Sequence, residues 1–509
     1  MNKYIRLFNT IKYLKFTQIY YRLFYFARNR FRKTTQFKYE FIRESNSTPL
    51  KLIDSCEYYS SYKNNKFKML NLSKEFDNKI DWNYCDYGKL WTYNLTYFEY
   101  LKEKEDISLI YNFIENIDSI KDGLEPFPIS LRGLNWIKFL NKFEIKDKKI
   151  DDSLYAQYYI LMDKLEYHLL GNHLLENGFS LLFGAYYFQD ETLYKKAKDI
   201  LEKELDEQIL DDGAHFELSP MYHQIMLFRL FDCINLVKNN NWKNQELLKY
   251  LEEKSSLMLG WIDQITYRNG DIPLLNDSAN KIAPSTKNLI KYASNLEINT
   301  RYKPLDKSGY IKINEKSYEA IIDVAHIGPD YIPGHAHADT LNFEIQVRNK
   351  PFIVDTGLST YNTGKLRDSQ RSTKSHNTIE VNTENSSEVW GGFRVAKRAN
   401  IIDFERTINT IKATHDGYKD NFGILHTRTW EFIYNKIIIS DSLNKNCNAI
   451  ARLHFYPDVK EEEILKKIKI KNSEFKIQNY DYAPEFNKTI KALVLEISFE
   501  KELKVEINI

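Results

Sequence analysis

The feature that most restricts the fold of this chain is a change in its hydrophobic pattern near residue 305. From about residue 95 to 300, apolar residues recur at the spacing of amphipathic helices, as in NQELLKYLEEKSSLMLGWIDQI at 244–265. After about residue 305, apolar and polar residues alternate as they do in half-buried strands, for example in KALVLEISFEKELKVEINI at 491–509. The pattern predicts a multidomain α+β protein in which helices precede strands.

Each half of the pattern favours a particular arrangement. Short Gly, Asp and Asn breaks separate the helical segments, which favours helical hairpins stacked into a ring or solenoid. Many alternating segments without intervening helices favour an antiparallel β-sandwich. We therefore predict three parts: a basic amphipathic segment at 1–40, a helical domain at 41–304 and a β-sandwich at 305–509. Ligands often bind where two such domains meet.

The N-terminal segment has an unusual charge distribution. No Asp or Glu occurs before Glu40, and Lys and Arg are interspersed with Tyr, Phe, Leu and Ile at helical spacing. One interpretation is that residues 1–35 make peripheral contact with an anionic membrane surface or a polyanionic polymer. The other is a helix that packs on its own domain and leaves its basic face in solvent.

Composition excludes several classes of protein. The net charge of +2 gives no overall attraction to nucleic acid, and none is expected as a partner. The four cysteines form no CxxC pair, so neither a disulfide framework nor a thiolate zinc site is expected. No apolar run reaches the roughly 18 residues of a membrane span, and charges interrupt every stretch that could serve as a signal peptide. We expect a cytoplasmic protein or one peripheral to the inner membrane.

The segment GHAHADTLNF at 334–343 carries three ionisable side chains at alternate positions. If it is extended, His335, His337 and Asp339 project from one face of a strand. Two imidazoles and a carboxylate suit zinc or another divalent metal, whereas the alternative is a polar strand edge without chemistry. His337 could also join Asp355, which ends an apolar strand, and His376, which precedes another, in a three-ligand zinc set.

The helical half contains two further polar clusters. In GNHLLENG at 171–178, Asn172 and His173 open a helix, although Asn172 could simply cap it. The segment DDGAHFELSPMYHQIM at 211–226 places Tyr222 near a helix N-terminus, where its ionisation would be favoured. A buried, hydrogen-bonded tyrosine is the alternative. LRGLNW at 131–136 adds an arginine beside a tryptophan, a combination common in clefts that bind polymers.

Taken in order, these segments resemble the heparinase II/III-like family of polysaccharide lyases, which overlaps some alginate lyases. The resemblance runs from about residue 90 to past residue 400 and is most specific in GHAHADTLNFEI, FIVDTG and RSTKSHNTIEVN. It implies an incomplete (α/α) toroid followed by antiparallel β-sheets, which agrees with the hydrophobic pattern. It also implies a periplasmic location as the alternative to a cytoplasmic one.

The resemblance assigns roles to individual residues. Tyr222 and His335 take the positions of the catalytic tyrosine and histidine, and Asn172 with His173 would bind the substrate carboxylate. His337, Asp355 and His376 take the positions of ligands to a structural zinc, with Asp339 orienting one of the histidines. The residues expected to contact an acidic polysaccharide are Arg132, Trp136, Glu176, His223 and Arg371.

The implied reaction is β-elimination at a uronic acid, possibly within a bacterial capsule or surface polysaccharide. A base removes the C5 proton, an amide donor stabilises the charge that develops on the carboxyl group, and an acid protonates the departing O4. Tyr222 would be the acid, and also the base if nearby positive charge lowered its pKa, while His335 would be the base for the other epimer.

Three other functions stay open at this point. A metal-dependent hydrolase could use the His-x-His pair, although Thr340 stands where metallo-β-lactamase-like enzymes need a histidine. A glycoside hydrolase could pair two of Asp211, Asp212 and Glu217. A non-catalytic polysaccharide-binding or assembly protein could retain the same fold.

Overall fold

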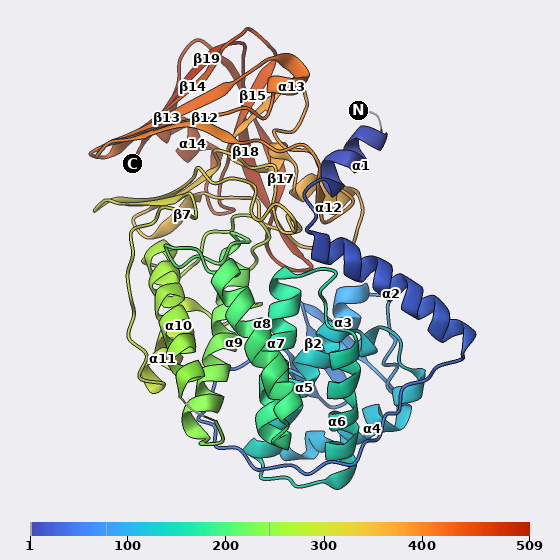
Figure 1. Cartoon of the computed structure of the whole chain (residues 1–509). Helices are drawn as coiled ribbons and strands as arrows, with labels where there is room; N and C mark the ends of the chain where they lie inside the picture. Colours follow the sequence, from blue (N-terminus) through green and yellow to red (C-terminus); the bar gives the residue numbers. More distant parts are fainter. Residues whose placement is uncertain (1–2, 78, 244) are drawn as a thin grey trace.

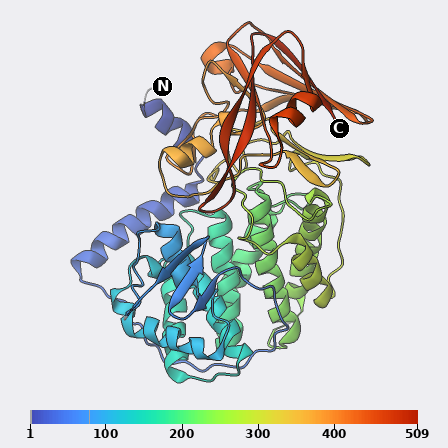
Figure 2. The same ribbon diagram turned by 180° about the vertical axis from the view of Figure 1, so that it is seen from behind.

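The computed structural model describes residues 3–77, 79–243 and 245–509. Figure 1 shows a helical part below a part made of β-sheets, with the N-terminal helices along one side. Figure 2 shows a small sheet on the outside of the helical part, which was not expected: β1 (Ser61–Lys63), β2 (Lys66–Met69) and β3 (Leu72–Glu75). None of the described helices combines the length and the apolar character that a membrane crossing requires.

The helical part is an incomplete α/α toroid. Several of its helices start where the sequence supplies a cap, because the side chains of Asp147, Asp190, Ser219 and Ser285 accept backbone N–H groups of the first turn. The helices are α3 (Lys89–Tyr97), α4 (Ile107–Asn116), α5 (Pro126–Lys142), α6 (Lys148–Asp163), α7 (Gly171–Phe188), α8 (Glu191–Gln208), α9 (Pro220–Asn239), α10 (Glu246–Ile265) and α11 (Thr286–Asn295).

Helix α7 lies at the centre of the toroid and packs against α5, α8 and α9. All its residues except His173 are buried. Two glycines permit this packing, because a Cβ at Gly184 would lie 2.7 Å from ring atoms of Tyr158 and one at Gly178 would lie 2.8 Å from Ile200. The close packing fixes the first turn of α7, which faces the β part.

The β part contains three larger antiparallel sheets rather than the two of a simple sandwich. They share one apolar cluster that extends from Ile311 to Ile507. The first sheet comprises β4 (Tyr310–Asn314), β5 (Tyr318–Asp323), β6 (Phe343–Val347) and β7 (Lys350–Ile353). The second has the order β11 (Ile401–Arg406), β12 (Thr410–His415), β13 (His426–Ile433), β14 (Lys436–Leu443), β19 (Glu502–Asn508) and β16 (Ile468–Ile470). The third has the order β17 (Glu474–Glu485), β18 (Lys488–Phe499), β15 (Ala449–His454) and β8 (Ile379–Val381).

Shorter elements complete the β part. They are the strand pair β9 (Val389–Trp390) and β10 (Arg394–Val395), with the short helices α12 (Lys365–Gln370), α13 (Lys419–Phe422) and α14 (Glu461–Lys467). The last toroid helix ends at Asn295 and β4 begins at Tyr310, on either side of the predicted boundary at 304/305.

Two helices precede the toroid, α1 (Lys3–Ile11) and α2 (Phe16–Thr34). Helix α1 contacts the β part, where Arg6 pairs with Glu388. Helix α2 lies along the toroid, where Arg32 pairs with Asp163. The two helices therefore bridge both parts of the molecule at one edge of their junction.

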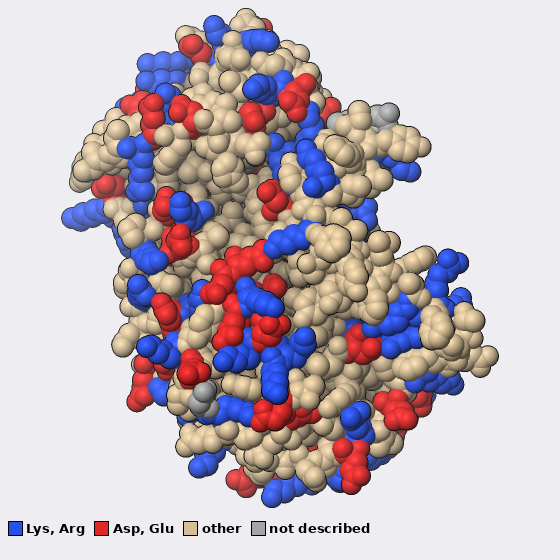
Figure 3. Space-filling view, in the orientation of Figure 1, with Lys and Arg blue, Asp and Glu red and all other residues tan. Residues whose placement is uncertain are grey.

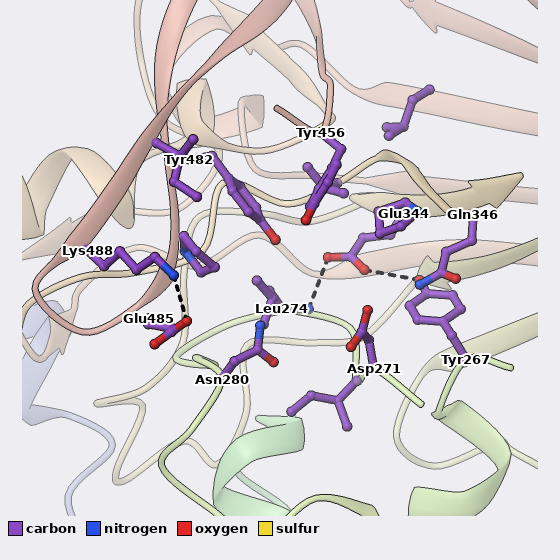
Figure 4. A pocket seen from close by; sticks show the side chains of 16 residues that line it. Tyr267, Asp271, Leu274, Asn280, Glu344, Gln346, Tyr456, Tyr482, Glu485 and Lys488 are labelled. Carbon is purple, nitrogen blue, oxygen red and sulfur yellow. Dashed lines mark hydrogen bonds and ion pairs between the residues drawn. The ribbon is translucent and has the colours of Figure 1, made fainter. Parts of the chain in front are cut away.

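A small cavity of about 200 Å³ lies between the loop that follows α10 and the β part (Figure 4). The buried carboxylate of Glu344 accepts hydrogen bonds there from the Tyr267 hydroxyl and from the backbone N–H of Leu274. The hairpin between β17 and β18 closes the cavity with the ion pair of Glu485 and Lys488. These contacts couple the first and third sheets to the loop that leaves α10.

A buried carboxyl group on α8 predicts a pH-dependent stability. Burial raises the pKa of Glu204 to about 7, although its Oε2 accepts a hydrogen bond from Gln208. The unfolded carboxyl titrates near 4.3, so the folded protein binds more protons between these values and its free energy of unfolding falls as pH rises from about 4.3 to 7. We expect Glu204→Gln to raise the free energy of unfolding at pH 8 by about 2 kcal/mol and to leave it unchanged at pH 4. Urea unfolding at both pH values tests this, and an equal effect at both would contradict it.

Candidate active site

The largest cavity that contains candidate catalytic residues lies where the toroid, the β part and helices α1 and α2 meet. Its volume is about 820 Å³. The four residues predicted to be catalytic all line it: Asn172, His173, Tyr222 and His335. Residues from α7 and α9 thus meet a residue from the loop before β6.

The segment 334–342 does not form the extended strand on which the alternation argument depended. It is irregular, and β6 begins only at Phe343. His335 and His337 nevertheless contact the same group, because Asp277 lies 2.8 Å from His335 Nδ1 through Oδ2 and 2.8 Å from His337 Nε2 through Oδ1. His335 borders the cavity and His337 is fully buried. This placement is compatible with a catalytic His335 and a zinc-binding His337. It does not arise from alternation along a strand.

Asn172 occupies the first turn of α7 but does not cap the helix. The N-cap position belongs to Leu170, which has a φ of 63° and makes no side-chain cap. The Asn172 side chain instead donates from Nδ2 to the carboxylate of Glu217, at 3.1 and 2.8 Å, and lies 3.3 Å from His335 Nε2. Glu217 therefore orients the amide toward the histidine.

His335 is held as a neutral-imidazole base would be. Its Nδ1 donates to Asp277, so its Nε2 carries the lone pair in the neutral ring. That nitrogen lies beside Asn172 Nδ2 and 3.5 Å from Glu217 Oε2. The ring stacks on Tyr222 with 3.9 Å between centroids. This arrangement of a carboxylate behind an imidazole whose second nitrogen can accept a proton is suited to proton abstraction.

Tyr222 is at the start of α9, where its backbone N–H donates to the Ser219 side chain. Its hydroxyl accepts a hydrogen bond from Tyr361 at 3.2 Å. Burial raises the pKa of Tyr222, and the carboxylates of Asp277 and Glu217 add to this effect. The prediction that the helix N-terminus or nearby positive charge would favour ionisation is therefore wrong. Tyr222 is a protonated phenol at neutral pH and can donate a proton.

Asp277 and Arg367 are central to the site but were not identified from the sequence. Both guanidinium Nη atoms of Arg367 bind the Asp277 carboxylate, at 2.5 and 2.6 Å. Burial alone would raise the pKa of Asp277, but Arg367 and the two histidines outweigh it and hold this pKa well below its usual range. The carboxylate therefore stays charged. In the sequence, the only indication of Asp277 was its position in the polar run NDSAN, which follows an apolar stretch.

His173 supplies positive charge to the other side of the cavity. Its Nδ1 lies 3.1 Å from Glu166 Oε1, and about a third of its side chain is exposed. Burial opposes protonation, but the Glu166 carboxylate outweighs this and raises the pKa of His173. The imidazole is therefore poised to be a cation next to Asn172.

The residues predicted to bind zinc lie near one another behind His335. His376 Nδ1 contacts Asp355 Oδ2 at 2.7 Å, and the rings of His337 and His376 are 5.2 Å apart. Among the described residues, His337 Nδ1 and His376 Nε2 are buried without a hydrogen-bond partner. In the same part of the chain, no three His, Cys, Asp or Glu side chains already converge on a common metal position.

The environment of Asp339 does not fit its predicted role of orienting one of the histidines. One of its carboxylate oxygens is buried and, within the described residues, has no hydrogen-bond partner. Burial raises the pKa of Asp339 to about 6. Asp277 and Asp355, rather than Asp339, make the hydrogen bonds that orient the histidines.

The five residues predicted to contact the polysaccharide are all buried and do not line the cavity. Their partners are protein groups: Arg132 binds Gln157 and two backbone carbonyls, Trp136 packs on Phe98 and Phe113, Glu176 binds Arg229, His223 binds the Met258 carbonyl, and Arg371 binds the Ala336 carbonyl. We correct their assignment from substrate contact to support of the fold. Sequence alone could not distinguish Arg371, which holds the loop before His337, from Arg367 one helical turn earlier.

Arg132 gives a direct test of this correction. Its Nη1 donates to the carbonyls of Thr96 and Gly123, and burial lowers its pKa to about 9. We expect Arg132→Met to lower the free energy of unfolding by about 1–3 kcal/mol, because two buried carbonyls lose a donor, and to leave KM unchanged. Chemical unfolding and steady-state kinetics of the same samples measure both. An increase in KM at unchanged stability would restore the substrate role.

Other cations and aromatic rings line the cavity in place of those five. The cations are Arg22 from α2, Lys89 from α3 and Arg394 from β10. Burial lowers the pKa of Arg22, and the positive charge of Arg394 lowers it further. Besides Tyr222, the aromatic residues are Tyr93, Tyr97, Phe127, Tyr331, Tyr361, Trp390 and Phe393. Such a surface suits an anionic sugar, whose ring can stack and whose charge can lie between the arginines.

Comparison with known proteins decides the family. Residues 138–302 match the model described as Heparinase II/III N-terminus, and residues 297–494 match the model described as Heparinase II/III-like, C-terminal. The chain belongs to the heparinase II/III-like family. The two matches also meet at the junction between α11 and β4.

Individual relatives are distant. A heparin-sulfate lyase of Bacteroides stercoris is 23% identical over 317 residues, which is 57% of this chain and 46% of that protein. The chain thus spans less than half the length of this relative. A crystal structure of heparinase III is similar with a TM-score of 0.68 at 16% identity, covering 97% of this chain and 91% of the other. A heparan sulfate lyase from Pedobacter heparinus has a TM-score of 0.53 at 15% identity, covering 87% and 81%. These structures support the toroid and β-sheet fold of the heparinase II/III-like chain.

Proposed function

We propose that this heparinase II/III-like protein is a polysaccharide lyase that cleaves a uronic-acid-containing polysaccharide by β-elimination. The observation that carries the proposal is the convergence of an amide, an imidazole base and a protonated phenol on one cavity, in Asn172, His335 and Tyr222. The names of the relatives point to heparan sulfate as the first substrate to test. The cations and aromatic rings of the cavity suit an acidic sugar.

In the first step, the substrate carboxylate lies against Asn172 and the His173 imidazolium. Neutralising that carboxylate acidifies the C5 proton, which is otherwise too weakly acidic to remove. Glu217 takes one amide hydrogen of Asn172 and fixes the direction of the other. A donor held in this way needs no reorganisation as charge builds on the carboxyl group.

In the second step, His335 Nε2 takes the C5 proton while Tyr222 gives its phenolic proton to O4. The electron pair of the C5–H bond forms the C4–C5 double bond, and the C4–O4 bond breaks. Asp277 stabilises the imidazolium formed on His335, as a buried carboxylate does for a histidine base. The proton on His335 then returns to Tyr222 through solvent, and no water is added to the sugar.

The products give a direct test of this function. β-Elimination leaves an unsaturated uronate that absorbs ultraviolet light, so incubation with heparan sulfate and other uronate polymers should generate a new absorbance together with new reducing ends. A glycoside hydrolase would release reducing ends without that absorbance. A binding or assembly protein would do neither, and either result would overturn the proposal.

A structural zinc held by His337, Asp355 and His376 is part of the proposal. Its support is chemical, since two imidazoles and a carboxylate suit zinc, Asp355 Oδ2 lies beside His376 Nδ1, and His337 Nδ1 is buried without a partner among the described residues. When bound, the ion would join the loop of His337 to the ends of β7 and the segment before β8. No catalytic step passes through it, because His335 and Tyr222 carry the proton transfers.

We expect His376→Ala to lower the zinc content of the purified protein from about one ion per chain to near zero. The melting temperature of the wild type should fall when a chelator is added, and that of the variant should not respond. Elemental analysis and thermal unfolding measure these effects. His415→Ala is the matched control, because His415 is another buried histidine, which contacts His426. Wild-type protein without zinc, or zinc retained by His376→Ala, would contradict the assignment.

A further inference from the structure

Helices α1 and α2 expose an unusual amount of apolar surface. Large apolar side chains on them are between 42% and 81% exposed, namely Ile5, Leu7, Phe8, Ile11, Phe16, Ile19, Tyr20, Leu23, Phe24, Phe26 and Phe31. In Figure 3 the surface over these two helices is tan interspersed with blue patches of Lys and Arg. Soluble proteins expose single apolar residues routinely, but a continuous apolar face of this size marks a surface that binds something.

The polar side of each helix, rather than its apolar side, faces the protein. On α2, Gln18, Tyr25 and Arg28 follow one another at helical spacing and donate to backbone carbonyls of the toroid, at Leu169, Leu165 and Asp163. On α1, Arg6 binds Glu388 and Thr10 accepts from Trp390. A helix that packs on its own domain normally does the opposite. Helix α2 thus packs on its own domain, as the second interpretation of this segment supposes, but Arg28 and Arg32 contact the toroid instead of facing solvent.

The apolar face of α2 forms a continuous stripe. At 100° per residue, Phe16, Ile19, Tyr20, Leu23 and Phe24 lie within one half of the helix surface, and Phe26 and Phe31 extend the same half. Arg30 lies among them, with its guanidinium 5.4 Å from the centre of the Phe26 ring, and Lys33 lies at the edge of the stripe. Apolar residues bordered by basic ones are the pattern of helices that lie in a membrane interface.

The charge of this segment identifies the partner. Residues 1–39 contain ten Lys and Arg and no Asp or Glu. A second copy of this chain placed on the same face would bring two such basic segments together, which is electrostatically unfavourable. An anionic lipid surface instead provides both apolar depth and negative charge. We propose that the α1–α2 face docks on anionic lipid membranes.

The same helices form a wall of the catalytic cavity. Leu7, Ile11, Leu14 and Gln18 line the cavity, whereas Phe16 and Leu23 face solvent. Docking through the outer side therefore places the mouth of the cavity beside the lipid headgroups. The proposal does not depend on the chemistry inside the cavity, so it stands or falls separately from the lyase assignment.

Sedimentation with lipid vesicles tests the proposal. Full-length protein is mixed with vesicles of phosphatidylcholine alone or with 30% phosphatidylglycerol (about one anionic lipid in three), at low and high salt. We expect binding to the anionic vesicles that weakens at high salt. The variant Phe16→Ser, Leu23→Ser, Phe31→Ser should bind at least ~10-fold more weakly, since three membrane-facing side chains are lost. Its melting temperature should be unchanged, because these side chains are 65–81% exposed.

A matched variant separates this face from exposed apolar residues in general. Phe404→Ser, Ile408→Ser, Tyr434→Ser removes three side chains of the β part that are 46–95% exposed, and it should bind vesicles as the wild type does. Three outcomes would overturn the proposal. They are equal binding to neutral and anionic vesicles or to neither, equal loss of binding in both triple variants, and a dimer in sedimentation equilibrium that only the first variant dissociates.

Discussion

Tyr222→Phe should reduce kcat of the lyase reaction by about 10³-fold or more, within the range that a positioned acid contributes. In the proposed mechanism the phenol donates a proton to the leaving O4, and burial raises the pKa of Tyr222, which keeps the phenol protonated at neutral pH. The ring and its stacking on His335 remain in the variant, so KM should change little. The rate of absorbance increase with heparan sulfate measures both constants.

Tyr93→Phe is the control for Tyr222→Phe. Tyr93 lines the same cavity and carries the same phenol group. Among the described residues, no hydrogen bond or ring contact joins it to His335 or Tyr361. Its kcat should stay within a few-fold of the wild type. Full activity in Tyr222→Phe would remove the phenol from the mechanism, and an equal loss in both variants would show that the cavity needs tyrosine hydroxyls for binding rather than for proton transfer.

Asp277→Asn should have an effect of similar size on kcat, about 10²- to 10³-fold, through the histidine that it holds. The asparagine keeps the shape of the side chain but removes the charge that stabilises an imidazolium on His335. KM should stay within about threefold of the wild type, because Asp277 is buried and does not line the cavity. The free energy of unfolding should also fall by about 3–5 kcal/mol, since Arg367 loses its buried partner.

A second substitution separates the two effects of Asp277→Asn. Adding Arg367→Met removes the unpaired buried charge and should recover most of the lost stability, without recovering kcat. Urea unfolding and kinetics of the single and double variants form the test. Recovery of activity along with stability would mean that Asp277 serves only the fold.

The sequence predicted the order of the domains because hydrophobic periodicity is a local property. The change from helical to alternating spacing near residue 305 falls between α11 and β4. Sheet number is not local, since the three sheets share one core through contacts distant in sequence. The prediction of a simple sandwich therefore described the type of element correctly and the layering incompletely.

The site illustrates the same limit at the level of single residues. Asn172, Tyr222 and His335 were found through motifs, and the structure brings them to one cavity. Asp277 was missed because it is 58 residues from His335, and its partner Arg367 is a further 32 residues away. A motif also does not show whether its polar residues are buried. Arg132 was therefore predicted to contact the substrate, whereas in the structure it lies in the core.

Asp277 belongs to the loop between α10 and α11 of the toroid, whereas His335, His337 and Arg367 all come from the β part. The proposed base is thus held across the junction between the toroid and the β part, two bodies that also share apolar contacts. A slight separation of those bodies, too small to melt either one, would release His335 from its carboxylate. Heating should therefore abolish turnover several degrees before the main unfolding transition, so that loss of activity reports on the joint and not on the toroid or the sheets.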